Sequence, residues 1–152
     1  MSPVTRLATI FLLAAAANTI NVKLPSGQVL KVELAASPED LGRGLIGRKS
    51  ISPGMLFVYP GDMRTRYHLM GYLMPVDILY IDENKTIVNL RENVPPCPTT
   101  DGACGYDSIW MHRYALQLPA GSVKRFNLHG GDVLSFDLPS GKNKGARNLR
   151  KN

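Results

Sequence analysis

A chain of 152 residues is long enough to bury a hydrophobic core of its own, and 44% hydrophobic with 20% charged residues excludes disorder throughout. The net charge of +6 gathers at the ends, because the last eleven residues hold five basic residues and no acid. Without that tail and Arg6, twelve basic residues balance twelve acidic ones, so the neutral body of the chain does not favour nucleic-acid binding.

The two ends of the chain differ from the body in composition. Residues 7–17 form an uncharged apolar run of eleven behind Arg6 and end in small alanines, which is typical of a signal peptide. The run is too short for a membrane-spanning helix, which needs roughly 20 apolar residues. We therefore expect residues 1–17 to be a signal peptide and the protein to be exported to the periplasm or the cell exterior, with no transmembrane segment. We expect residues 141–152 to form a basic flexible tail.

The body begins with two runs of alternating apolar and polar residues, 20–24 and 28–34, separated by a Pro-Ser-Gly turn. This pattern predicts a β-hairpin. A short helix is predicted over 38–47, because Ser37 is a suitable N-cap and Pro38 favours the first helical position. Further strands are predicted at 55–59, 76–81, 86–90, 110–118 and 133–138, and a second short helix at 122–126.

Seven short strands, two small helices and no regular β-α alternation predict an α+β, mainly β fold. We expect residues 18–140 to form a single compact domain, an antiparallel barrel-like sheet with the two short helices. Closure into a barrel would bury one face of each strand and remove the exposed edges.

Two cysteines, Cys97 and Cys104, are separated by six residues rich in Pro, Thr, Asp and Gly. Such a segment can reverse the chain and bring the two sulfurs together. An even cysteine count in an exported protein predicts a disulfide. Two thiols at this spacing match neither a CxxC redox motif nor a complete structural zinc site.

A series of motifs occurs in a fixed order along the body: SPEDLGRGLIGR at 37–48, GMLFV at 54–58, PVDILYID at 75–82, ENVPPC at 92–97 and YALQLPAG at 114–121. Over residues 28–137 the chain resembles the domain of unknown function 192 family. The resemblance implies a small exported β-rich domain and no established activity.

The chain departs from this family in one segment. The family typically has Phe-Trp-Met-Lys-Asn-Thr where this chain has Tyr-His-Leu-Met-Gly-Tyr at 67–72. Met70, Gly71 and Tyr72 thus replace a cation, an amide and a hydroxyl by a single phenol. If those three residues bind a ligand in relatives, the specificity of this protein is different.

The candidate site residues are Asp77, Arg91 and Glu92, with His68 and Tyr72 as further candidates. Asp77 interrupts an apolar strand, and a buried carboxylate is costly unless it is paired. One hypothesis is a small pocket for a hydroxylated ligand; another is an acid–base pair of carboxylates as in sugar hydrolysis. The structural alternative is that Asp77 pairs with Arg91 or accepts backbone hydrogen bonds that order the cysteine loop.

Other motifs do not point to a particular chemistry. The three histidines lack the spacing of a metal site, and no serine lies in a GxSxG motif, so we expect no metal, cofactor or catalytic residue. The leading hypothesis is an exported, noncatalytic binding or interaction module for a glycan or a protein. The alternatives are a small exported glycan-acting enzyme that uses Asp77 and Glu92, and a structural subunit that retains the N-terminal segment and the basic tail for assembly.

Overall fold

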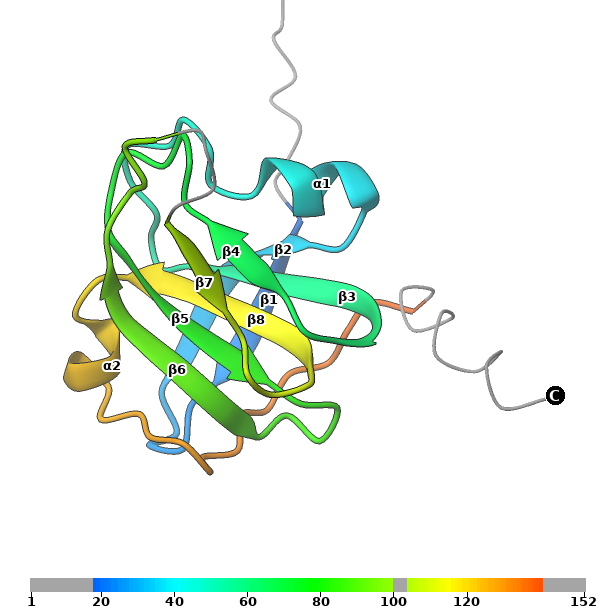
Figure 1. The fold of residues 1–152 in the computed structure, drawn as a ribbon. Coiled ribbons are helices and arrows are strands. Elements are labelled where there is room, and N and C mark those ends of the chain that lie inside the picture. Colours follow the sequence, from blue (N-terminus) through cyan, green and yellow to red (C-terminus); the bar gives the residue numbers. More distant parts are fainter. Residues whose placement is uncertain (1–17, 100–103, 141–152) are drawn as a thin grey trace, which may run out of the picture.

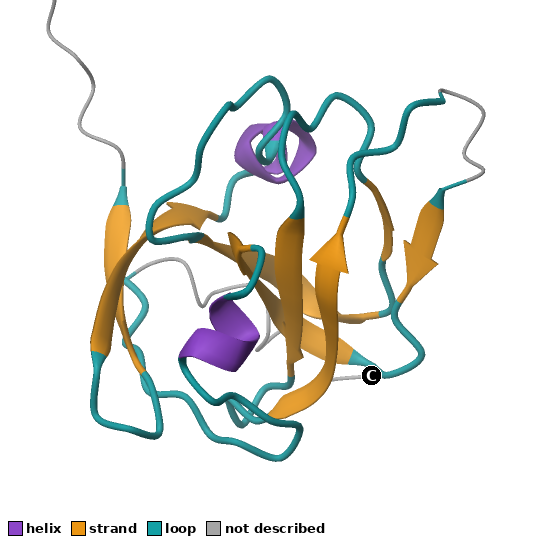
Figure 2. Cartoon of the chain, turned by 90° about the vertical axis from the view of Figure 1, so that its left-hand side faces the viewer, coloured by secondary structure: helices purple, strands orange, loops and turns teal. Residues whose placement is uncertain are grey.

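The computed structural model describes residues 18–99 and 104–140 (Figure 1). The predicted signal peptide and basic tail lie outside these residues. The elements are β1 Thr19–Lys23, β2 Val29–Ala35, α1 Pro38–Arg43, β3 Met55–Met63, β4 Arg66–His68, β5 Val76–Ile81, β6 Ile87–Val94, β7 Gly105–Asp107, β8 His112–Pro119 and α2 Ser122–Arg125. The protein is mainly β with two short helices, as predicted (Figure 2). The helices α1 and α2 lie on opposite sides of the molecule (Figure 1). Within the described residues, no helix is long and apolar enough to cross a membrane.

Six strands form one mixed sheet in the order β1-β2-β3-β8-β5-β6. Four of the five pairings are antiparallel, whereas β2 and β3 pair in parallel. The sheet that we expected to be antiparallel is therefore mainly antiparallel, with one parallel pair. The reason is the connection: α1 and the following loop bring the chain back beside Glu33, where β3 begins, and parallel strands require such a crossover. Two short strands, β4 and β7, form a separate antiparallel pair, and neither strand was predicted from the sequence.

The sheet is open, with β1 and β6 at its edges, so its ladder does not form the expected closed barrel. The predicted last strand is an extended segment that makes isolated bridges between Lys23 and Ser135 and between Thr86 and Val133. Its backbone hydrogen bonds reach β1 on one side and the β5–β6 turn on the other. The C-terminal segment therefore spans the distance between the two edges without completing a strand.

The central strands are buried on both faces, and all six residues of β5 are buried. Side chains alternate between the faces of a strand, so neighbouring residues enter different cores. Leu79 and Leu116 pack in one core, with β1, β2 and the C-terminal segment. Ile78 and Tyr80 pack in the other, beneath α1 and the β4–β7 pair. This second face carries the candidate site described below.

The first helix is capped as its sequence predicts. The Ser37 hydroxyl accepts a hydrogen bond from the Asp40 backbone N–H at 3.1 Å, and Pro38 begins the helix. The helix ends at Arg43, four residues earlier than predicted, because Gly44 adopts a positive φ of 46°. A Cβ at Gly44 would lie 3.1 Å from the Tyr72 hydroxyl, so this glycine lets the helix end approach Tyr72 closely.

Candidate functional site: an aromatic pocket

A pocket of about 320 Å³ opens between α1, β3, β4 and the segment before β5. Four aromatic rings and two guanidinium groups dominate its lining: Phe57, Tyr59, Tyr67, Tyr72, Arg43 and Arg66. These residues come from four segments of the chain, so the pocket is a product of the tertiary fold. We refer to it as the aromatic pocket.

The strand β3 contributes two of these rings, Phe57 and Tyr59, and the burial of its residues decreases along the strand. Its first four residues are fully buried, and from Tyr59 onward half-buried and exposed residues alternate. Phe57 and Tyr59 lie two positions apart and therefore on one face of the strand. Tyr67 follows from β4, and its ring packs edge-on against Phe57 with centroids 6.3 Å apart. The pocket wall is thus the continuation of a packed aromatic cluster.

Three phenol groups supply polar tips to this wall. The hydroxyls of Tyr59 and Tyr67 hydrogen-bond to each other, and the Tyr72 hydroxyl donates to Gln117 Oε1 at 2.9 Å. Burial raises the pKa of Tyr59 to about 12 and raises the pKa of Tyr67 well above its usual range. Burial also raises the pKa of Tyr72. All three phenols therefore remain neutral hydrogen-bonding groups at physiological pH.

The charged part of the lining is basic. Arg66 pairs with Asp107 at 2.6 Å, and Arg43 pairs with Glu39 along α1. Both pairs are largely exposed, and neither acid lines the pocket. Exposed pairs of this kind contribute little energy, so each guanidinium can also bind a ligand.

A second, open hollow of about 360 Å³ lies beside β5, β6 and α2, and Asp77, Glu92, Asn93 and Lys124 line it. Asp77 is completely buried. One of its carboxyl oxygens accepts a hydrogen bond from the Asn93 N–H at 2.7 Å, and the other accepts one from the Val123 N–H at 2.8 Å. The side chain thus ties β5 to the end of β6 and to the start of α2. This arrangement agrees with the structural alternative in which Asp77 accepts backbone hydrogen bonds.

The structure does not gather the five candidate residues of the sequence into one site. Asp77 and Glu92 share the second hollow, whereas Tyr72 lines the aromatic pocket. Within the described chain, Asp77 does not form an ion pair with Arg91, which was one form of the structural alternative. Arg91 lies opposite Ile78, and its guanidinium donates to the Asp107 carbonyl at 3.5 Å. His68 lies in β4, where its backbone pairs with Gly105.

The predicted disulfide between Cys97 and Cys104 is present. It joins the chain that follows β6 to the residue that precedes β7. The Cys97 N–H also donates to the Leu69 carbonyl at 3.1 Å. The bridge therefore holds the segment between β4 and β5 beside β7, at the margin of the aromatic pocket.

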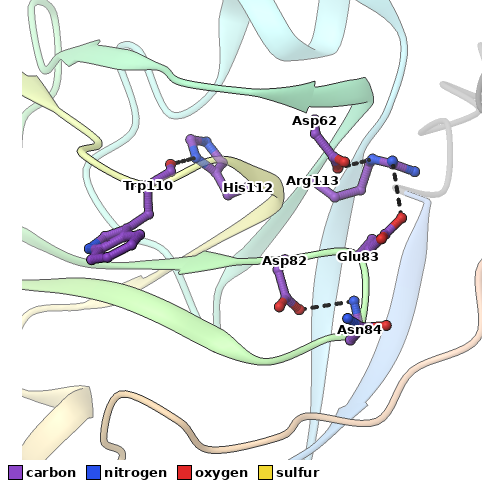
Figure 3. Close-up of polar contacts among 7 residues, drawn as sticks. All are labelled: Asp62, Asp82, Glu83, Asn84, Trp110, His112 and Arg113. Atoms are coloured by element: carbon purple, nitrogen blue, oxygen red, sulfur yellow. Dashed lines mark hydrogen bonds and ion pairs between the residues drawn. The ribbon is translucent and has the colours of Figure 1, made fainter.

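A buried histidine supports the pocket from behind. The His112 ring packs edge-on against Tyr59 and Tyr80, with centroids 5.6 and 5.0 Å away. Its Nδ1 lies 3.1 Å from the Trp110 carbonyl (Figure 3). Its Nε2 lies 3.0 Å from Thr65 Oγ1. Burial lowers the pKa of His112. Across the described residues, no three His, Cys, Asp or Glu side chains are grouped to hold a metal ion.

Sequence reasoning missed most of the pocket. Tyr59 was predicted to end a strand, whereas Thr65 and Arg66 lie in a part of the chain for which no strand or helix was predicted. The one available signal was the departure from the family pattern at 67–72, because both ends of that segment, Tyr67 and Tyr72, line the pocket. The rest depends on contacts between segments distant in sequence.

Comparison with known proteins places the chain in a family. Residues 20–136 match the model of DUF192, described as an uncharacterized ACR. A UPF0127 protein of Thermococcus gammatolerans is 24% identical over 115 residues, which cover 74% of this chain and 71% of that relative. A UPF0127 protein of Thermococcus kodakarensis is 23% identical over 108 residues, which cover 70% and 64% of the two chains.

Two solved structures share the fold. A protein of Sinorhizobium meliloti 1021, provisionally described as a transcription regulator, matches with a TM-score of 0.70 and 32% identity, covering 80% of this chain and 96% of that one. A protein of unknown function from Novosphingobium aromaticivorans matches with a TM-score of 0.66 and 21% identity, covering 77% and 83% of the two chains. Because the family model spans most of the sequence, the protein belongs to the DUF192 family.

Proposed function

We propose that the protein is an exported, noncatalytic module that binds a short glycan in the aromatic pocket. The observation that carries this proposal is the lining itself, in which aromatic faces and phenol hydroxyls surround a volume of about 320 Å³. Small-molecule sites commonly enclose roughly 300–1,000 Å³. An aromatic ring can pack against the apolar face of a sugar while its hydroxyl bonds to the sugar's hydroxyl groups.

The polar groups of the pocket support binding rather than catalysis. Within the described chain, the lining contains no Asp, Glu, His, Cys or Lys side chain. The raised pKa values of Tyr59 and Tyr67 keep these phenols protonated, so they are poor bases near neutral pH. Arginine is likewise unsuited to proton transfer because it remains charged.

Filling the pocket tests the proposal. Gly42 lies in α1 and lines the pocket, and a Cβ at this position meets no atom within 4 Å. Gly42→Trp should therefore fold and obstruct the pocket. We expect a panel of mono- and disaccharides, titrated by NMR, to include a ligand whose affinity falls at least tenfold in this variant.

Gly61→Trp is the matched control, because a Cβ at Gly61 also meets open space and Gly61 does not line the pocket. Saccharide binding that is equal in the two variants would place the site elsewhere. A panel without any ligand for the wild-type protein would count against the proposal as a whole.

The second hollow is the alternative site, and the activity proposed for it is glycan hydrolysis by Asp77 and Glu92. The observation in its favour is that both carboxyl residues line one hollow. Against it, Asp77 is fully buried and bonded to two backbone N–H groups. Turnover of chromogenic glycosides that is abolished by Glu92→Gln would establish the enzymatic function.

Nucleic-acid binding is suggested by the description of the Sinorhizobium relative. The neutral charge balance of the body does not favour it, since such proteins depend on a basic face to neutralise phosphates. A mobility-shift assay at low salt is the direct test, and specific retardation of DNA would support this alternative.

Export is proposed from residues 7–17. Mass spectrometry of the protein from its native source should give a mature chain that begins near Asn18, with two hydrogens fewer than the reduced mass because of the disulfide. An intact Met1 or Ser2 terminus would contradict export and favour a structural subunit that retains the segment.

A further inference from the structure

We infer that the glycan bound in the aromatic pocket is anionic, a sugar whose carboxylate or phosphate group is held by Arg66 and Arg43. This inference rests on the proposed function and specifies its ligand class. It begins from the all-basic charge of the pocket lining, which differs from the neutral charge balance of the body of the chain.

The charge of the lining comes from two arginines. Arg43 and Arg66 are the charged residues of the lining, and within the described chain no acid accompanies them there. Because the body of the protein is neutral, the basic lining is a local feature of the pocket. Arg43 and Arg66 are paired with Glu39 and Asp107, two acids outside the lining, and because both pairs are exposed each guanidinium can share its donors with the anionic group of a ligand.

The position of Arg66 suits this role. A Cβ added at Gly105 would lie only 2.0 Å from Arg66 Nε, so the guanidinium lies directly on the backbone of β7. Its Nη1 is bonded to Asp107, on the same short strand. The side chain is thereby held at the pocket margin by β7, and the ion pair is exposed enough to be shared or exchanged with an incoming anion.

The neighbouring hydroxyls complement the guanidinium groups. The phenols of Tyr59 and Tyr67 stay protonated because burial raises the pKa of each, so neither adds negative charge beside an anion. Thr65 lines the pocket next to them and provides a further hydroxyl. The pocket thus combines cations and neutral hydroxyls around aromatic faces, which matches a sugar acid or sugar phosphate.

Three probes of similar size separate the possibilities: glucose, glucuronate and glucose 6-phosphate, titrated by calorimetry at low and at physiological salt. We expect at least one of the two anions to bind tenfold or more tightly than glucose, and the preference to weaken as salt rises. The stronger of the two identifies a carboxylate or a phosphate ligand.

Arg66→Gln should reduce the ratio of anion affinity to glucose affinity to threefold or less. Arg125→Gln is the matched control, because Arg125 is exposed on α2 on the opposite side of the molecule. Equal binding of glucose and both anions would overturn the inference and leave the proposed function standing, as would a preference that survives Arg66→Gln. If none of the three probes binds, the inference is overturned, and the saccharide panel above then decides the proposed function separately.

Discussion

At the scale of single residues, Asp77 is a buried polar group that bonds to two other segments of the chain. It is completely buried, and its two oxygens accept hydrogen bonds from Asn93 and Val123. Asn93 has a positive φ of 50°, a conformation that is rarely adopted by residues other than glycine. The carboxyl group therefore stabilises both a strained position at the end of β6 and the first turn of α2.

Replacing Asp77 by Asn should lower the free energy of unfolding by about 1–3 kcal/mol, because an amide has one acceptor oxygen and places its NH₂ group against the second backbone N–H. Urea denaturation measures the loss. Asp137→Asn is the control, since Asp137 is exposed. An Asp77→Asn variant as stable as the control would contradict the structural role of Asp77.

His112 should give the stability of the protein a pH dependence. Burial lowers its pKa below the usual value near 6.5, so the unfolded chain takes up a proton at a higher pH than the folded chain. The free energy of unfolding should therefore fall as the pH is lowered through about 6.5, by at most about 1.4 kcal/mol per pH unit for one proton.

His112→Gln should reduce this slope between pH 7 and 5, as measured by denaturation at each pH. His129→Gln is the matched control, because the side chain of His129 is 66% exposed. An unchanged slope in the His112 variant would assign the pH dependence to other groups.

At the scale of elements, the β4–β7 pair depends on the disulfide more than on its own hydrogen bonds. Each strand has three residues, and isolated two-stranded pairs are marginally stable. The bridge from Cys97 to Cys104 fixes the residue before β7, and Cys97 is itself bridged to Met70 beyond β4. Both strands are thus held on the second core.

Changing both cysteines to Ser should lower the free energy of unfolding by about 2–3 kcal/mol, mainly because the unfolded chain gains freedom. NMR shifts should change at β4 and β7 and remain close to wild type in the six-stranded sheet. The untreated wild-type protein should resist thiol reagents until it unfolds; quantitative reaction of the native protein would show that the bridge is not formed in solution.

At the scale of the whole molecule, the C-terminal segment compensates for the open sheet. Leu134 and Phe136 are buried in the first core, and the backbone around them bonds to Lys23 and Lys85 on the two sides. This segment covers apolar surface that a closed barrel would have covered with a continuous strand.

Leu134→Ala should therefore cost about 2–5 kcal/mol of unfolding free energy, as expected for truncation in a packed core. The neighbouring Val133→Ala should change stability by about 0.5 kcal/mol or less, because Val133 is 58% exposed. Thermal or urea denaturation of the two variants measures this difference. If the segment contributed no packing to the core, the two variants would be equally stable.

The sequence by itself determined the features that are local. Alternation and turn residues located the first hairpin and the strands β5, β6 and β8, and the Ser37-Pro38 pair located the start of α1. The short Pro/Gly-rich spacing was enough to predict the disulfide. Each of these features depends on interactions between residues that are close in the sequence, so the sequence pattern is sufficient to predict it.

The tertiary structure alone decided the parallel pairing of β2 with β3, the open sheet and the composition of the site. Asp77 finds its partners 16 and 46 residues along the chain, where no pattern could indicate Val123. The aromatic pocket joins Arg43 on a helix to Tyr59 and Tyr67 on two strands of different sheets. Such contacts form because α1 and the β4–β7 pair pack on the sheet. This packing brings together side chains that are far apart in the sequence.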